Sequence, residues 1–177
     1  MKLLIIVSVV IILITVLVLM FIFSKNKFNY LDIKIDEALS NISLYLLKKE
    51  TTLNNIIKII IDEGADENEF DDFNELIEKD NTSFELHSIL NKYYSILSKL
   101  LLDKETLLKN DDIIKHLKNL ENNEEDLIGS IKFYNDTVVD YNGLINTFPH
   151  KFYAKIKSLD NKDFYNNEKE ELFDILK

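Results

Sequence analysis

Hydrophobic residues follow two different patterns along the chain, and the first lies at the N-terminus. From Leu3 to Phe23 there are 21 residues without a charge, and Ser8 and Thr15 are the polar ones among them. A helix rises about 1.5 Å per residue, so this length spans about 30 Å, the thickness of the hydrocarbon core of a bilayer. The segment therefore predicts a transmembrane helix.

A cleaved secretory signal peptide is the alternative for this segment. Such a peptide has a shorter apolar core, followed by small residues at the cleavage site. The stretch from Met20 to Ser24 has no pair of small residues, which favours a retained anchor. We expect an anchor at residues 1–24 and one domain at residues 25–177.

The lysines at the two ends of the span indicate its orientation. Lys2 precedes the span, whereas Lys25, Lys27 and Lys34 follow it. Because the basic side of a span usually faces the cytoplasm, we expect a single-pass protein of the cell membrane with a short N-terminus outside and the domain inside. The two sides differ by few charges, and the opposite orientation stays an alternative.

Beyond Ser24 the apolar positions step by three and four, which is the spacing of the core-facing positions of a helix. The first seam comprises Leu39, Ile42, Leu46, Lys49, Leu53, Ile56 and Ile60. The second seam, within residues 81–103, comprises Leu86, Leu90, Tyr93, Leu97 and Leu100. The third seam comprises Leu117, Leu120, Glu124, Leu127, Ile131, Tyr134, Val138, Tyr141 and Ile145. Each seam predicts a long helix.

The ends of these helices are marked by local breaks. Residues 64–68 end the first helix, which can run on from the transmembrane span, and Pro149 ends the last because proline cannot continue the hydrogen-bond ladder. Residues 69–79 form either a brief helix or an acidic loop, and residues 167–176 predict a short helix. Three seams must be buried on one another. The predicted fold class is all-α, with an N-terminal transmembrane helix followed by an antiparallel up-and-down helical bundle of three long helices plus one or two short helices.

Composition limits the kinds of function. The 31 acidic residues against 21 basic ones give a net charge of -10, which would repel a nucleic-acid backbone. There is no cysteine, and His87, His116 and His150 lie on separate segments without a partner four residues away. The acidic run between residues 62 and 72 lacks the ligand pattern of a calcium loop. We expect no nucleic-acid partner, no metal, no cofactor and no enzymatic activity.

Lys49 and Glu124 interrupt otherwise apolar seams. A buried charge without a partner is costly, so each must find a partner or reach water. One interpretation is a buried charge pair that sets the register of the bundle, and the other is that both side chains extend to its edge. If the first and last long helices were parallel, Glu85 would be the better partner for Lys49.

Two Tyr-Asn pairs, Tyr134-Asn135 and Tyr141-Asn142, lie seven residues apart, so both tyrosines share one helix face. They can form a recognition strip. The structural interpretation, which we favour, places the tyrosines in the core with their hydroxyls at its rim and the asparagines on neighbouring backbone groups.

The order and spacing of specific residues resemble the sequence pattern of LemA family proteins. The C-terminal part carries, in order, Tyr134, Asn135, Val138, Tyr141, Asn142, Ile145, Phe148, Pro149, Ala154 and Phe164. The first helix carries Ala38, Ser40, Ile42, Leu44, Leu46, Lys48, Lys49 and Asn55. The resemblance implies a single-pass membrane protein with a helical bundle, and it implies no activity.

Two functions agree with these observations. The first is a membrane-anchored, non-catalytic protein that binds another protein or itself, in an interaction or scaffolding role. The second is a bundle that holds a lipid or small amphipathic ligand near the membrane, in a cavity lined by Phe133, Tyr134 and Tyr141.

Overall fold

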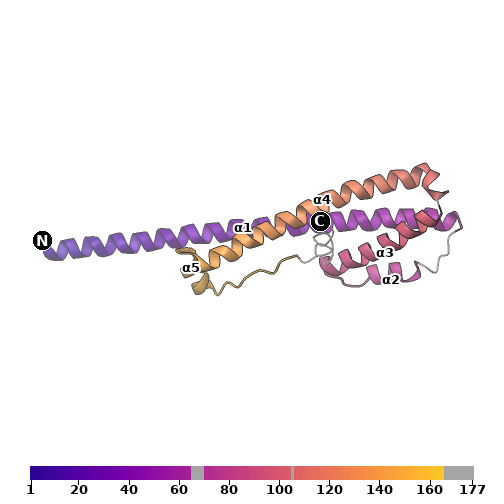
Figure 1. Ribbon diagram of the computed structural model, residues 1–177. Helices are drawn as coiled ribbons and strands as arrows, with labels where there is room; N and C mark the ends of the chain where they lie inside the picture. Colours follow the sequence, from indigo (N-terminus) through magenta and orange to yellow (C-terminus); the bar gives the residue numbers. More distant parts are fainter. Residues whose placement is uncertain (65–69, 105, 166–177) are drawn as a thin grey trace, which may run out of the picture. The chain divides into compact units, whose positions relative to one another are not determined.

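The computed structural model describes residues 1–64, 70–104 and 106–165, except for the side chain of residue 71. All regular elements in these ranges are helical (Figure 1). They are α1 (Lys2–Asp62), α2 (Asp71–Ile77), α3 (Ser83–Asp103), the short 3-10 helix η2 (Leu107–Lys109), α4 (Asp111–Asn146) and α5 (His150–Lys157). The predicted all-α class is confirmed, whereas the helix predicted over residues 167–176 lies outside the described residues.

The chain divides into two compact units. Unit 1 comprises Met1–Ala38 and Phe133–Phe164, and unit 2 comprises Leu39–Lys132 and Tyr165–Lys177. Helices α1 and α4 each contribute residues to both units. Helix α1 continues past Ser24 without a break, as the absence of helix-breaking residues there allows.

The N-terminal part of α1 in unit 1 is exposed on every face. Its most apolar window of 18 residues has a mean hydropathy of 3.5, and none of that window is buried. Among the described residues, α1 is the one helix long and apolar enough to cross a membrane. The length and composition that predict a transmembrane span therefore occur together with complete exposure.

In unit 2, α2 and α3 lie alongside the C-terminal half of α1 (Figure 1). Ser43 Oγ lies 3.4 Å from Ser83 Oγ, and Lys49 contacts Asn91. Residue numbers thus rise together in α1 and α3, which run parallel. The core contains the apolar seam residues Ile42, Leu46, Leu53, Ile56, Ile60, Leu90, Leu97, Leu120 and Leu127, all of them buried.

Helix α4 runs antiparallel to α1 in unit 2. Asn110, just before α4, donates a hydrogen bond to Glu63, whereas Glu124 further along α4 contacts Lys49. The parallel arrangement of the first and last long helices, on which Glu85 was the alternative partner for Lys49, is therefore wrong. The return of the chain between α1 and α3 includes α2, so the undecided segment at residues 69–79 contains a brief helix.

Local sequence explains where the helices of unit 2 begin and end. Gly64, two residues beyond α1, has φ +90°, a left-handed conformation that glycine adopts without steric cost. Helix α3 begins with a capping box, in which Thr82 Oγ1 accepts a hydrogen bond from the Glu85 amide and Glu85 Oε2 accepts one from the Thr82 amide. The bonds that the Thr82 amide and hydroxyl donate to Glu85 Oε2 lower the pKa of this carboxyl.

In unit 1, α1 packs against α4 and α5 around the buried Phe28. The Phe28 ring lies 5.2 Å from the Tyr141 ring of α4 and 5.7 Å from the Tyr153 ring of α5, measured between centroids. Pro149 lies at the N-cap position of α5, after a cis Phe148–Pro149 bond. Proline ends α4 as predicted, but the helix that follows it was not predicted.

Candidate functional site

The ammonium group of Lys49 is the centre of a buried polar cluster in unit 2. Its side chain is 2% exposed and comes from the apolar seam of α1. Lys49 Nζ donates to Asn91 Oδ1 of α3 at 2.8 Å and to Glu124 Oε2 of α4 at 2.5 Å. It also lies 5.8 Å from the centroid of the Tyr94 ring. The structure thus brings Lys49 and Glu124 together, while Glu85 is exposed in its capping box.

The two partners of this ion pair differ in their access to water. The Glu124 side chain is 36% exposed, against 2% for Lys49. The lysine therefore depends on its protein partners for the interactions that it loses on leaving water, whereas the carboxylate keeps part of its hydration. This arrangement connects α1, α3 and α4 through one side chain. The Lys49 ammonium is bound to a carboxylate, whereas a nucleophilic lysine needs an uncharged amine.

Two asparagines of this cluster were not predicted. Asn91 supplies the amide oxygen for Lys49, and Asn123 Nδ2 donates to the carbonyl oxygen of Tyr45 at 2.9 Å. Both are buried, each next to a seam residue in sequence. Asn123 Oδ1 has no hydrogen-bond partner among the described residues. A polar residue beside a charged or apolar seam position is the signal that could have identified them.

The predicted Tyr-Asn pairs of α4 lie in unit 1, where they hold the segment that follows α5. The Tyr134 hydroxyl donates to the Asp163 carbonyl oxygen at 2.9 Å. Asn142 Nδ2 donates to the Lys162 carbonyl oxygen at 2.9 Å, and Asn142 Oδ1 accepts from the Lys162 amide at 2.8 Å. Tyr141 is buried and Asn135 is half-buried. These contacts agree with the structural interpretation of the pairs.

Lys162 strengthens the same attachment. Its ammonium lies 2.7 Å from Asp32 Oδ1 of α1 and 4.9 Å from the centroid of the Tyr141 ring. Burial opposes the charged form of Lys162, but the hydrogen bond and charge of Asp32, together with Tyr141 and Asp36, outweigh it, so the pKa of Lys162 is raised. Burial is also the main cause of the raised pKa of both Tyr134 and Tyr141. The lysine is therefore charged and the tyrosines are neutral at pH 7.

The histidines and the remaining predicted residues are spread over separate elements. His87 is buried in α3, His116 lies in α4, and His150 is buried in α5. Among the described residues no group of three or more His, Asp or Glu side chains is placed to hold a metal ion. Phe148 is 80% exposed, next to the half-buried Pro149. Residues 65–69 of the acidic run between residues 62 and 72 lie outside the described residues.

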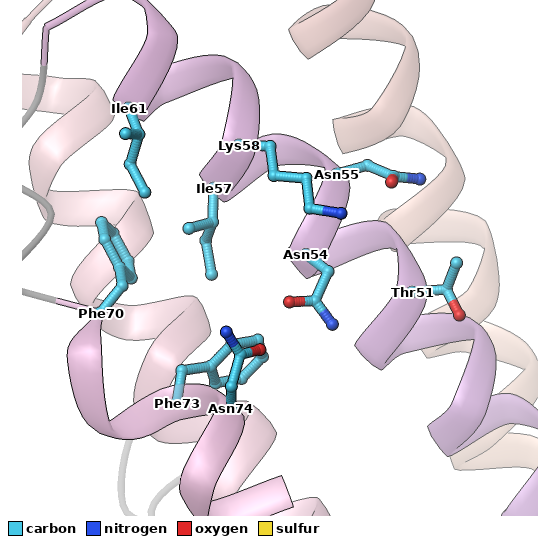
Figure 2. Close-up of a pocket in the computed structure, with 9 residues that line it drawn as sticks. All are labelled: Thr51, Asn54, Asn55, Ile57, Lys58, Ile61, Phe70, Phe73 and Asn74. Atoms are coloured by element: carbon cyan, nitrogen blue, oxygen red, sulfur yellow. The ribbon is translucent and has the colours of Figure 1, made fainter.

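A groove in unit 2 lies between α1 and the region of α2, and the sequence did not indicate it. It encloses about 610 Å³ and is lined by Thr51, Asn54, Asn55, Ile57, Lys58, Ile61, Phe70, Phe73 and Asn74. Figure 2 shows Asn54 and Asn74 extending into the space between the two helices, near the Phe73 ring. Ile57, Phe70 and Phe73 are buried and form its apolar side.

The polar side chains of this groove have unused hydrogen-bonding capacity. Within the described residues, no side-chain hydrogen bond or ion pair involves Asn54, Asn55, Lys58 or Asn74. Each amide can donate two hydrogen bonds and accept two, and the ammonium can donate three. The groove can therefore recognise a ligand that has both donors and acceptors, such as a peptide backbone.

Comparison with known proteins identifies the family but no individual relative. A sequence model described as the LemA family matches residues 38–174, which is more than half of the chain. The chain therefore belongs to the LemA family. No curated protein matches the chain, and no solved structure matches it either.

Removing one member of the buried ion pair should destabilise the protein unequally. Glu124→Leu leaves a buried ammonium without its carboxylate, and we expect a loss of about 3–5 kcal/mol in the free energy of unfolding. Lys49→Met leaves a carboxylate that water can reach, so we expect a loss of about 1–2 kcal/mol. Urea unfolding of the full chain in detergent micelles, followed by far-UV circular dichroism, measures both losses.

The double variant Lys49→Met, Glu124→Leu is the control for this pair. It carries neither charge, so it should be more stable than Glu124→Leu alone. A double variant whose loss is the sum of the two single losses would contradict a coupled pair, and equal losses in the two single variants would contradict the expected inequality. An unchanged stability of Lys49→Met would also count against it.

Asn142→Ala should release the segment around Lys162 from α4. The substitution removes both hydrogen bonds to the Lys162 backbone, and we expect a loss of about 1–3 kcal/mol in local stability. Hydrogen exchange of the Lys162 amide should then be faster by about tenfold or more. Asn122→Ala is the matched control because Asn122 is an exposed asparagine of the same helix. Equal exchange rates in the two variants would show that Asn142 does not hold this segment.

Proposed function

We propose that the protein is a non-catalytic binding protein, held at the cell membrane by α1, whose groove receives a peptide segment of a partner protein. One observation carries this proposal. The amides of Asn54 and Asn74 extend into a groove of about 610 Å³ and make no side-chain hydrogen bond within the described residues. Polar groups in that position are available to a ligand.

The chemistry of the groove favours a peptide. Carboxamides match the alternating N–H and C=O groups of a peptide backbone, because each can donate and accept. The buried side chains of Ile57, Phe70 and Phe73 can take an apolar side chain of the same peptide. Lys58 adds one cation that can bind a carbonyl or carboxylate oxygen. Apolar contacts then supply affinity, and the amides fix the orientation.

The anchor supports an interaction or scaffolding role. An exposed apolar helix of this length is costly in water and stable in lipid, so it concentrates the rest of the chain at a membrane. The lysines that follow the span favour a cytoplasmic bundle, and the opposite orientation is the alternative. A partner at the same surface is met at a higher effective concentration.

A lipid or small amphipathic ligand is the second candidate occupant. The volume of the groove lies within the range of about 300–1,000 Å³ that small-molecule sites have. The sequence predicted a different site for such a ligand, a cavity lined by Phe133, Tyr134 and Tyr141. There the Tyr134 hydroxyl is bonded to Asp163, the buried Tyr141 packs on Phe28, and the half-exposed Phe133 lies below the Lys34 ammonium. Because these three side chains already contact other residues of unit 1, the groove is the better site for such a ligand.

Photo-crosslinking tests which occupant the groove has. We would place p-benzoylphenylalanine at Asn74, an exposed lining residue, in the full chain within native membranes. A partner peptide should give an adduct with a second protein. The substitution Asn54→Ala in the same chain should weaken this adduct several-fold, since each lost hydrogen bond costs about 1 kcal/mol.

The same crosslinker at Asn119, an exposed asparagine of α4, is the matched control. Adducts of equal yield at the two positions, or an adduct that Asn54→Ala leaves unchanged, would overturn the proposal. A mass increase of lipid size would favour the second candidate. An adduct between two copies of the chain would show self-association in place of a different partner.

A further inference from the structure

Helix α5 has two apolar faces, and one of them has no covering contact in unit 1. Its His150, Tyr153 and Ala154 are buried. On the other side, Phe152 is 63% exposed and Ile156 is 53% exposed. Residues four apart share one helix face, so these two side chains form a stripe. Phe148, just before α5, adds a third large apolar group that is 80% exposed.

The buried face of α5 packs on the end of the apolar stretch of α1. The Tyr153 ring lies 4.8 Å from the Phe21 ring between centroids, and His150 Nδ1 lies 3.1 Å from Ser24 Oγ. Figure 1 shows α5 beside this part of α1. Phe21 and Ser24 are within about one helical turn of Phe23, where the apolar stretch ends. If α1 spans a bilayer, α5 therefore lies at the level of the lipid headgroups.

The charge of this region is opposite to that of the whole chain. Residues 21–31 contain Lys25 and Lys27, and residues 147–159 contain Lys151, Lys155 and Lys157. Neither segment contains an acidic residue, although the chain has a net charge of -10. Burial lowers the pKa of His150 in α5, and the charge of Lys27 lowers it further. Five cations thus lie on two segments that pack together.

We infer that α5 is an interfacial helix, which inserts Phe152 and Ile156 among the lipids and binds anionic phospholipid headgroups through its lysines. An amphipathic helix in this position buries its apolar face about 5–10 Å into the boundary between headgroups and acyl chains. Each lysine near an anionic surface adds attraction. Because α5 packs on the end of the apolar stretch, the surface that its exposed stripe meets is the lipid surface. This inference rests on the proposed anchoring by α1.

The absence of natural cysteine makes the test direct. We would label Ile156→Cys with an environment-sensitive fluorophore in the full chain, reconstituted in vesicles of phosphatidylcholine and phosphatidylglycerol. Lipids with a doxyl group high on the acyl chain should quench this label at least about threefold more strongly than a label at Ile33→Cys. Ile33 is the matched control, because it is an isoleucine of unit 1 that is 65% exposed and lies beyond the apolar stretch.

A label at Val16→Cys separates the two possible failures. Val16 lies within the apolar stretch, so strong quenching there shows that α1 is inserted. Insertion at Val16 together with equal quenching at residues 156 and 33 would overturn the inference and leave the anchoring intact. A blue-shifted Ile156 label without doxyl quenching would show that protein covers the stripe, which also overturns it. Lack of quenching at Val16 would instead contradict the anchor.

The role of the lysines has its own measurement. Replacing Lys151, Lys155 and Lys157 with glutamine should reduce quenching at residue 156 by about half or more in the mixed vesicles. In vesicles of phosphatidylcholine alone, the same substitutions should change the quenching little. A loss of equal size in both kinds of vesicle would show that the lysines do not bind anionic headgroups.

Discussion

One helix with two kinds of surface is the constraint on which the rest of the structure depends. The first part of α1 is apolar on all faces, whereas beyond Ser24 it is apolar along one seam. A helix in hydrocarbon has to present apolar groups all round, and a helix at the edge of a core needs them on one side. The position of this change therefore determines where packing against α4 and α5 can begin. In unit 1 it begins at Phe21, Ser24 and Phe28.

In unit 2 the same seam carries a charge, and that charge restricts how the helices can be arranged. A lysine that is 2% exposed loses nearly all of its hydration, so its partners must come from other helices. Asn91 of α3 and Glu124 of α4 are these partners, and both lie beside Lys49 along the bundle. A shift of α3 or α4 by one turn would move these groups about 5 Å away. An apolar residue at position 49 would not oppose such shifts in this way, so the buried charge restricts the register of the three helices.

Sequence reasoning could predict the features that depend on neighbours three or four residues apart. The buried seams, the break at Gly64 and the end of α4 before Pro149 are of this kind. It could propose Lys49 with Glu124 because both interrupt an apolar seam, but it could not decide between partners until the direction of α4 was known. Sequence reasoning could not predict contacts between residues distant in sequence. These are the bond from Lys49 to Asn91, the bonds between Asn142 and Lys162, and the contacts that form the groove. Helix α5 was missed because a segment of eight residues after a proline gives too short a periodic signal.

For the inferred contact of α5 with anionic lipid, the local distribution of charge matters more than the net charge of the chain. Net charge acts at distances beyond about 10 Å only weakly at physiological salt, because counterions screen it. The surface therefore responds to the groups nearest to it, which around the end of the apolar stretch are five lysines and no carboxylate in the segments that carry them. Two carboxylates, Asp32 and Asp160, follow directly after these segments, and Asp32 forms an ion pair with Lys162. The charge of acidic residues further along the chain is weakened at that surface by the same screening. A local excess of lysine within a chain of opposite net charge is thus compatible with the inferred contact of α1 and α5 with a membrane.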